Sequence, residues 1–399
     1  MKRQPLAGPR RIVALDARPG PAVDAPRFLW LIGFHASSAD IAMTLQGPAE
    51  RGDSMARTAL VTGITGQDGA YLSRLLLDKG YRVFGAFRRG ASLSLWRLHE
   101  LGVAESDIEF IPFELLEYAN LRRAIEETKP DEIYNLGAQS FVGISFEQPL
   151  FTTDVNALGV ARMLEAIREV NPAIKLYQAS TSEMFGKVRA VPQNELTPFH
   201  PRSPYAISKL YAHWMTINYR ESYDLFACSG ILFNHESPLR GIEFVTRKIT
   251  AGLARIREGQ QDVIELGNID AKRDWGFAGD YVEGMWRMLQ QSEPDDFVLA
   301  TGTTASVRSF CELVAAALDY DLVWEGEGVD TTGVDRRSGK TIIRVNPKLY
   351  RPAEVDLLIG DASKARNKLG WMAEMALPQL AEMMVEADLR RTRAGQVLL

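Results

Sequence analysis

Short apolar runs rich in β-branched and aromatic residues alternate with longer helical patterns between residues 58 and 233. The strand-like runs are Thr58–Gly63, Tyr81–Phe87, Ile108–Phe113, Glu132–Ala138, Ile174–Ser180 and Phe226–Phe233. Segments with helical periodicity separate them, and this alternation is typical of right-handed βαβ units. The pattern therefore predicts an α/β fold with a doubly wound parallel sheet that is covered by helices on both faces.

The alternation loosens after Phe233 into loops rich in proline, glycine and arginine. Amphipathic helical patterns recur there, at residues 243–259, 279–291, 306–318 and 377–392. We expect one domain over residues 55–233 and a smaller C-terminal lobe, mainly residues 234–399, that is interleaved with the first.

Residues 1–54 show no helical or strand period that could be sustained. Met55 stands directly before the first strand-like run, so we expect translation to start there and the preceding residues to be an upstream extension. A disordered tail is the alternative, and composition alone does not decide between them.

Charge and cysteine content restrict the possible partners. The formal net charge is -5, with 46% hydrophobic and 24% charged residues, which gives no sign of the clustered basic surface that binds nucleic acid or an anionic membrane. Cys228 and Cys311 are too few for a disulfide framework or a structural zinc site, and the histidines show no H-x-x-x-H pair. The apolar run Phe28–Phe34 is far shorter than the roughly 18 residues that span a membrane. We expect a reduced, cytoplasmic protein without a metal.

The first strand-like run ends in "TGITGQDG", which places Gly63, Gly66 and Gly69 at three-residue spacing before a helix. Glycine lets the backbone approach a pyrophosphate, and the free N–H groups of a helix start favour its negative charge. Without the flanking strand and helix, a plain tight turn would explain the glycines equally well. The context predicts a dinucleotide site.

Arg88 and Arg89 follow the second strand-like run, where an NAD site usually carries a carboxylate for the ribose 2′-hydroxyl. A guanidinium there would pair with a 2′-phosphate, so the predicted cofactor is NADP. The alternative is a solvated arginine pair.

Two further segments carry candidate chemistry. In "SPYAISK", Ser203 and Pro204 are typical of a helix N-cap and first position, which places Tyr205 and Lys209 on one helix face. A lysine ammonium near the phenol would lower the pKa of the tyrosine and make it a usable base, although the same spacing occurs on exposed helix faces. In "STSEMFG", Glu183 would lie just past the carboxyl end of a strand, where ligands bind in open α/β sheets.

These motifs resemble the extended short-chain dehydrogenase/reductase superfamily and, within it, the GDP-mannose 4,6-dehydratase family. The order and spacing of that family are matched by "TGITGQDGAYL", "YNLGAQSFV", "STSEMFG", "SPYAISK", "GILFNHESPLRG", "VTRKI", "KRDWGFAGDYV" and "RPAEVD" over nearly all of residues 57–390. The resemblance implies a Rossmann-type NADP-binding domain with a smaller, interleaved α/β lobe that binds the nucleotide sugar. It also implies a hydro-lyase that makes GDP-4-dehydro-6-deoxy-D-mannose and water from GDP-mannose, on the way to GDP-fucose or GDP-rhamnose.

The family's catalytic groups fall on Thr181, Glu183, Tyr205 and Lys209. By this resemblance, Tyr205 takes the proton of the 4-hydroxyl while hydride leaves C4, and Glu183 then removes the C5 proton before hydride returns to C6. Ser182 stands where relatives acting on dTDP-glucose carry Asp. The group that protonates the leaving 6-hydroxyl is therefore open, with Glu183 or a water held by Ser182 as candidates.

The resemblance also carries over binding positions. Besides Tyr205 and Lys209, the cofactor positions are Gly63, Ile64, Thr65, Gly66, Gln67, Asp68, Gly69, Arg88, Arg89, Glu114, Leu115, Leu136, Gly137, Ala138, Gln139, Ser140, His235 and Arg240. The substrate positions are Ser140, Asn234, Lys248, Arg273, Arg351 and Glu354. Among these, cations suit a diphosphate and a carboxylate suits the N–H donors of guanine.

The family match also predicts a homo-oligomer. A dimer is expected through two long helices near residues 156–168 and 204–219. Gly90 replaces a serine of the loop that supports a tetramer in the family, so dimer and tetramer both stay open. The competing functional hypotheses are another nucleotide-sugar epimerase or reductase of the superfamily, which needs no base in the place of Glu183, and a catalytically silent NADP-binding scaffold.

Overall fold

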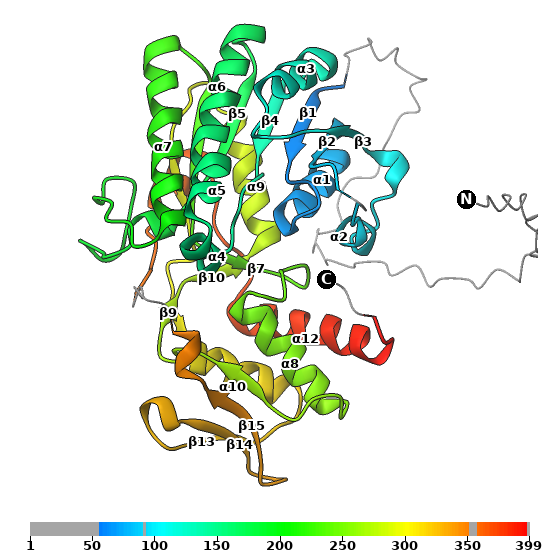
Figure 1. Cartoon of the computed structure of the whole chain (residues 1–399), viewed down its shortest axis with the longest axis vertical. Helices are drawn as coiled ribbons and strands as arrows, with labels where there is room; N and C mark the ends of the chain where they lie inside the picture. The colour runs from blue at the N-terminus through cyan, green and yellow to red at the C-terminus, as the bar shows by residue number, and fades with distance from the viewer. Residues whose placement is uncertain (1–55, 91–92, 351–356, 397–399) are drawn as a thin grey trace, which may run out of the picture. The chain divides into compact units, whose positions relative to one another are not determined.

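A seven-stranded parallel sheet carries the N-terminal part of the chain, with strand order β11-β6-β5-β4-β1-β2-β3 (Figure 1). The computed structural model describes residues 56–90, 93–350 and 357–396, which belong to one compact unit. The strands are β1 (Thr58–Thr62), β2 (Arg82–Phe87), β3 (Glu109–Pro112), β4 (Glu132–Asn135), β5 (Lys175–Thr181), β6 (Ala227–Leu232) and β11 (Phe297–Leu299).

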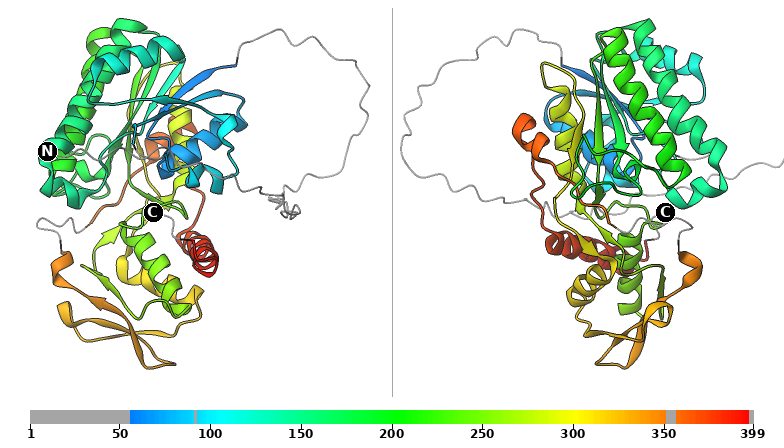
Figure 2. Two further views of the ribbon diagram at one scale, coloured as in Figure 1. Left: turned by 45° about the vertical axis from the view of Figure 1, so that its right-hand side comes forward. Right: turned by 90° about the vertical axis from the view of Figure 1, so that its left-hand side faces the viewer.

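Helices cover both faces of this sheet (Figure 2). One apolar core lies between the sheet and the helices α1 (Gln67–Asp78), α2 (Trp96–Glu100), α9 (Ala278–Leu289) and α11 (Ser363–Leu369). The core on the other face includes α3 (Tyr118–Thr128), α6 (Gly159–Val170) and α7 (Pro204–Tyr223). The short helices α4 (Val142–Glu147) and α5 (Pro149–Thr153) precede α6. The predicted doubly wound fold is confirmed.

The remaining elements form a second sheet and its helices, with their own apolar core. Its strand order is β13-β14-β15-β8, from β13 (Leu322–Glu325), β14 (Thr332–Asp335), β15 (Lys340–Val345) and β8 (Ile264–Leu266). Helices α8 (Val245–Arg257), α10 (Val307–Ala317) and α12 (Leu377–Arg393) pack on it, as the lower part of Figure 1 shows. Two further short sheets pair β7 (Asn234–Glu236) with β10 (Trp275–Phe277) in parallel and β9 (Lys272–Arg273) with β12 (Ala305–Ser306) in antiparallel orientation.

Strand β11 is an element that the sequence pattern did not predict. It pairs in parallel with β6 at the edge of the main sheet, although it follows residue 234 in the chain. Its three residues are too few to show a period of their own. The chain thus leaves the main sheet after β6 and returns to it before entering α10.

Candidate active site

The glycine turn joins β1 to α1 at the carboxyl edge of the main sheet. Gly63 has φ +67°, a left-handed conformation that favours glycine, and the Gly66 amide donates to the Gly63 carbonyl at 2.9 Å. A Cβ atom on Gly69 would lie 2.4 Å from the Gly63 oxygen, so a larger residue cannot sit there without moving the backbone. Helix α1 begins after Gly66 without a side-chain cap. The turn therefore offers a close backbone approach and a helix N-terminus to an anionic group.

A pocket of about 320 Å³ lies beside this turn. The predicted cofactor residues that line it are Gly63, Thr65, Arg88, Glu114, Leu115, Gly137, Ala138 and Gln139. Arg89 lies instead at a neighbouring surface groove with Glu117 and Arg123. The lining of the pocket beside the turn also includes side chains that the sequence analysis missed, namely Thr62, Phe87, Phe113, Phe151 and Val155. Thr62 could have been found from the sequence, because it stands near the end of a predicted strand, where ligands bind in open α/β sheets. In the structure its hydroxyl accepts a hydrogen bond from the Gly137 amide at 2.9 Å.

Helix α7 places the predicted tyrosine and lysine together. Ser203 caps the helix by accepting from the Ala206 amide at 3.1 Å, and Pro204 occupies the first turn, as the sequence predicts. Tyr205 and Lys209 are both buried, 8% and 4% exposed, which excludes the exposed-face alternative for this pair. The Tyr205 phenol shares a hydrogen bond with the Thr181 side chain at the end of β5.

The expected low pKa of Tyr205 is not what the structure shows. Burial raises the pKa of Tyr205 to about 12, only partly offset by the hydrogen bond with Thr181. The Lys209 ammonium donates to the Ala179 carbonyl at 2.9 Å and not to the phenol. Burial also lowers the pKa of Lys209 to about 8. Sequence spacing predicted the shared helix face but could not predict the desolvation that opposes ionisation of both groups.

Glu183 lies in the 3-10 turn Ser182–Met184 directly after β5. Its amide donates to the Thr181 hydroxyl at 3.2 Å. Glu183 lines a second pocket, of about 600 Å³, together with the predicted substrate residues Asn234, Lys248 and Arg273. Burial lowers the pKa of Lys248, and the charge of Glu265 opposes that shift.

The second pocket departs from the sequence expectation at several positions. Ser140 is exposed and is not among the residues that line this pocket, and Arg351 and Glu354 lie outside the described residues. Lining residues that the sequence analysis missed include Phe141, Glu236, Phe244, Glu265 and Asn268. They come from loops and short strands whose meeting depends on tertiary structure.

Asp68 and His235 form an ion pair between the first turn of α1 and β7. The His235 Nε2 lies 2.9 Å from the Asp68 Oδ2, and the His235 Nδ1 lies 2.8 Å from the Phe233 carbonyl oxygen. Burial opposes charge on both groups, but their mutual attraction outweighs it, so the pKa of Asp68 falls to about 2 and that of His235 rises. The two predicted cofactor positions are therefore partners of each other.

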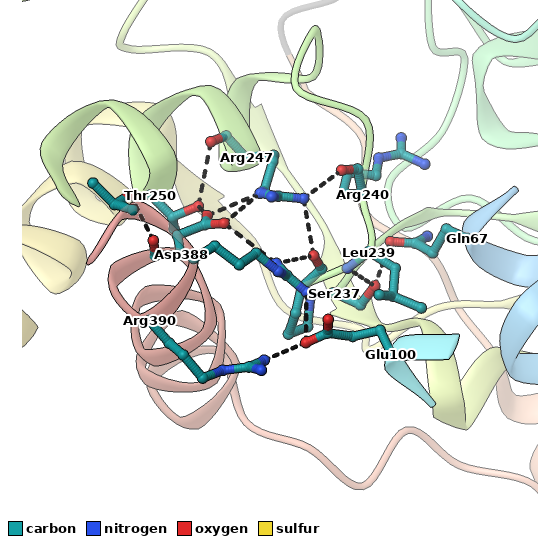
Figure 3. Close-up of polar contacts among 12 residues, drawn as sticks. Gln67, Glu100, Ser237, Leu239, Arg240, Arg247, Thr250, Asp388 and Arg390 are labelled. Atoms are coloured by element: carbon teal, nitrogen blue, oxygen red, sulfur yellow. Dashed lines mark hydrogen bonds and ion pairs between the residues drawn. The ribbon is translucent and has the colours of Figure 1, made fainter. Parts of the chain in front are cut away.

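A buried network holds the loop that follows β7 (Figure 3). Arg247 donates to both carboxylate oxygens of Asp388 at 2.8 and 2.9 Å, and Arg247 and Arg391 donate to the Pro238 carbonyl at 2.9 and 2.7 Å. The predicted site residue Arg240 lies in this loop and pairs with Glu236 at 3.1 Å. Helices α8 and α12 thereby fix the loop that carries part of the site.

The described residues contain neither a metal-binding cluster nor a membrane-spanning helix. No group of three or more His, Cys, Asp or Glu among them is arranged to hold a metal ion. None of the helices in the described ranges is long and apolar enough to cross a membrane.

Known proteins match most of the chain. The family model described as GDP-mannose 4,6 dehydratase matches residues 60–384. A GDP-mannose 4,6-dehydratase of Sinorhizobium fredii is 51% identical over 343 residues, which is 84% of this chain and 98% of the relative. The GDP-mannose 4,6 dehydratase of Homo sapiens is 49% identical over 344 residues, 84% of this chain and 92% of that protein.

Solved structures share the fold. DesIV, a dTDP-glucose 4,6-dehydratase of Streptomyces venezuelae with NAD and TYD bound, has a TM-score of 0.72 at 19% identity, covering 85% of this chain and 98% of that one. RMD from Pseudomonas aeruginosa complexed with NADPH has a TM-score of 0.65 at 22% identity, covering 84% of this chain and 100% of that one. The family model and the close relatives together show that the chain belongs to the GDP-mannose 4,6-dehydratase family.

Proposed function

We propose that this protein converts GDP-mannose to GDP-4-dehydro-6-deoxy-D-mannose and water. The observation that carries the proposal is the meeting of Thr181 and Glu183, at the end of β5, with Tyr205 of α7, which shares a hydrogen bond with Thr181. Glu183 lines a pocket together with three cationic side chains, Lys248, Arg255 and Arg273. A carboxylate in that place suits a reaction that needs a base besides the tyrosine.

The cofactor that we propose is NADP. The glycine turn fits a dinucleotide, because the backbone around Gly69 is packed too closely for a Cβ atom and the turn can approach a pyrophosphate. The pocket beside the turn is also lined by Arg88, which directly follows β2. A guanidinium there supports a 2′-phosphate over a free 2′-hydroxyl. When bound, NADP would accept hydride from C4 and return it to C6, so that no net redox change results.

Tyr205 is the proposed base for the 4-hydroxyl. Because burial holds its pKa near 12, the phenol enters the reaction protonated unless a neighbouring positive charge favours the phenolate. Lys209 supplies such a charge from one turn along the same helix, and Thr181 orients the phenol through their shared hydrogen bond. Oxidation at C4 then acidifies the hydrogen at C5.

Glu183 is the proposed base for that C5 hydrogen. Once the proton has moved to Glu183, the 6-hydroxyl leaves and the C5–C6 double bond forms. The protonated Glu183 carboxyl group can supply the proton that the leaving hydroxyl needs to become water. When hydride returns to C6, C5 takes up a proton from solvent, which balances the proton that Tyr205 removed from the 4-hydroxyl. Ser182 is buried, 2% exposed, which favours Glu183 over a water held by Ser182 as the acid.

Lys248 and Arg273 are the proposed diphosphate ligands. They come from different elements, α8 and β9, and line one pocket with Asn234. Two cations converging on one pocket suit a diphosphate, which offers several acceptor oxygens to each. Arg351 and Glu354 remain proposed substrate residues on the strength of the family match alone.

A homodimer through α7 is the proposed assembly. Ile207, Tyr211 and Trp214 are 57%, 41% and 55% exposed on one side of this helix, where they line a groove with Leu210 and Met215. An exposed apolar face of this kind suits a second copy of the chain. Sedimentation of wild type and Trp214→Asp tests it: the variant should lose the dimer, and an unchanged mass would refute this interface. The sedimentation mass of the wild type also distinguishes a dimer from a tetramer.

Two smaller proposals complete the account. The cytoplasm is the proposed compartment, in keeping with two cysteines that are both free and buried. The division into a cofactor domain ending at residue 233 and a substrate lobe also remains a proposal.

Incubation of the protein with GDP-mannose and catalytic NADP, followed by mass spectrometry of the nucleotide sugar, tests the function. We expect the loss of one water without accumulation of NADPH. Unchanged GDP-mannose together with turnover of dTDP-glucose or a UDP-sugar would contradict the substrate, and an epimerised or reduced sugar of unchanged or higher mass would contradict the reaction.

A further inference from the structure

The geometry around His235 identifies its protonation state. Both ring nitrogens face acceptors, the Phe233 carbonyl oxygen at 2.8 Å and an Asp68 carboxylate oxygen at 2.9 Å. A neutral imidazole carries only one N–H, so it would leave one of these contacts without a hydrogen, whereas the imidazolium satisfies both. His235 is only 9% exposed in its side chain, so water cannot readily substitute for either partner.

The pair is fixed on every side. The Gln67 Nε2 lies 3.0 Å from the other Asp68 carboxylate oxygen and 3.1 Å from the His235 carbonyl oxygen. The Ser237 hydroxyl donates to the side-chain amide oxygen of Gln67 at 2.8 Å, and Figure 3 shows this contact beside the arginine network that holds the loop. The Tyr281 ring stacks on the imidazole with centroids 4.6 Å apart. The first turn of α1 and strand β7 are therefore joined through one charged contact.

The other charged or titratable groups around the pair come from several elements. Arg240, which is itself paired with Glu236 at 3.1 Å, lowers the pKa of both Asp68 and His235. The others are Tyr205, Lys209 and the phenols of Tyr177 and Tyr281.

We propose that Asp68 and His235 are a positioning pair that fixes the phosphate-binding turn against the strand that enters the substrate pocket. Asp68 keeps His235 protonated, and the imidazolium ties the first turn of α1 to β7. The role of the turn in cofactor binding rests on the proposed function, whereas the protonation of His235 does not.

The protonation of His235 is tested in the cofactor-free protein by nuclear magnetic resonance of histidine-labelled enzyme. The chain has five histidines, so the spectrum is simple, and the His235 signal is assigned by its loss in His235→Gln or by replacing the other four in turn. We expect the His235 signal to keep its imidazolium position to higher pH than that of His213, because the charge of Asp68 raises the pKa of His235 whereas burial lowers the pKa of His213. A neutral His235 at pH 6.5 would overturn the pair.

The role of Asp68 is tested in Asp68→Asn. Loss of the carboxylate removes the charge that holds the proton on His235, so we expect the His235 signal to lose its imidazolium position at lower pH than in wild type and the dissociation constant for NADP to rise. Asp78→Asn is the matched control, because Asp78 lies on the same helix with a side chain 55% exposed and should leave both measurements unchanged.

The possible outcomes separate the pair from the proposed function. A His235 titration that does not move in Asp68→Asn would refute the charged pair, and unchanged NADP binding in that variant would refute its positioning role. Absence of turnover in the wild type would count against the proposed function and leave the His235 titration as the test of the pair. If Asp68→Asn does not fold, the titration of His235 in the wild type still decides whether the imidazolium exists.

Discussion

The Glu183 amide donates a hydrogen bond to the Thr181 hydroxyl across 3.2 Å, which holds the proposed base and the partner of Tyr205 in one turn after β5. Glu183→Gln keeps the size of the side chain but cannot accept a proton. We expect kcat for dehydration to fall by about 10² to 10⁴-fold, the usual contribution of a general base.

A pre-steady-state trace checks this role of Glu183. The variant should still form NADPH transiently as C4 is oxidised, and the substrate should fail to exchange its C5 hydrogen with deuterated water. Glu147→Gln, an exposed residue of α4, is the control. Normal product formation by Glu183→Gln would rule out the assignment.

Arg88 and Arg89 differ in position although they are adjacent in sequence. Arg88 lines the pocket beside the glycine turn, whereas Arg89 lines another groove. Arg88→Ala should weaken NADP binding by roughly 10 to 100-fold, the loss of about 1.5–3 kcal/mol for a charged hydrogen bond, and leave NAD binding nearly unchanged. Titration of both cofactors into each variant measures this, and an equal loss in Arg89→Ala would contradict the selection of Arg88.

Gly69 and Gly66 allow a graded test of the turn. A Cβ atom would lie 2.4 Å from the Gly63 oxygen at position 69, but 3.1 Å from it at position 66. Gly69→Ala should therefore displace the backbone and abolish measurable NADP binding, while Gly66→Ala should weaken it less. Equal dissociation constants for the two variants would show that the close backbone approach is not required.

The Asp68–His235 pair predicts a stability window in pH. The pKa of Asp68 falls from 3.8 to about 2, so its contribution is present above pH 3.8 and is lost as pH falls toward the folded value. The pKa of His235 is raised from 6.5, so its contribution is present below pH 6.5 and is lost as pH rises through the folded value. The free energy of unfolding of wild type should exceed that of Asp68→Asn most between about pH 4 and pH 6.5. The lowered pKa of Asp68 corresponds to a difference of about 2 kcal/mol. Urea unfolding across pH measures the difference, and a difference that keeps growing above pH 7 would be inconsistent with the pair.

Asp388 is the carboxylate shared by two buried arginines. Asp388→Asn leaves Arg247 and Arg391, 4% and 3% exposed, without that charge, and should cost about 3–5 kcal/mol of unfolding free energy. Glu258→Gln breaks the pair with Arg393, whose side chain is 61% exposed, and should cost less than about 1 kcal/mol. Similar losses in both variants would mean that burial of the network adds little.

Local sequence predicted the helices and turns of the site better than the contacts between residues that are far apart in the chain. Ser203 and Pro204 correctly predicted the start of α7, and the glycine spacing correctly predicted the turn before α1. Both predictions were possible because caps and turns depend on nearby residues. The link from Asp68 to His235 spans 167 residues, and no local pattern encodes such a contact. An α/β lobe was expected, but the individual strands of its four-stranded sheet were not identified, since such short strands are specified by their packing partners.

Return of the C4 hydride to C6 is the central claim, and a labelled substrate tests it most directly. GDP-mannose carrying deuterium at C4 is turned over with catalytic NADP, and the product is analysed by nuclear magnetic resonance. The account predicts that the deuterium appears at C6 of the product, because the cofactor takes and returns the same hydride. Deuterium that stays at C4, or that accumulates in released cofactor, would contradict it.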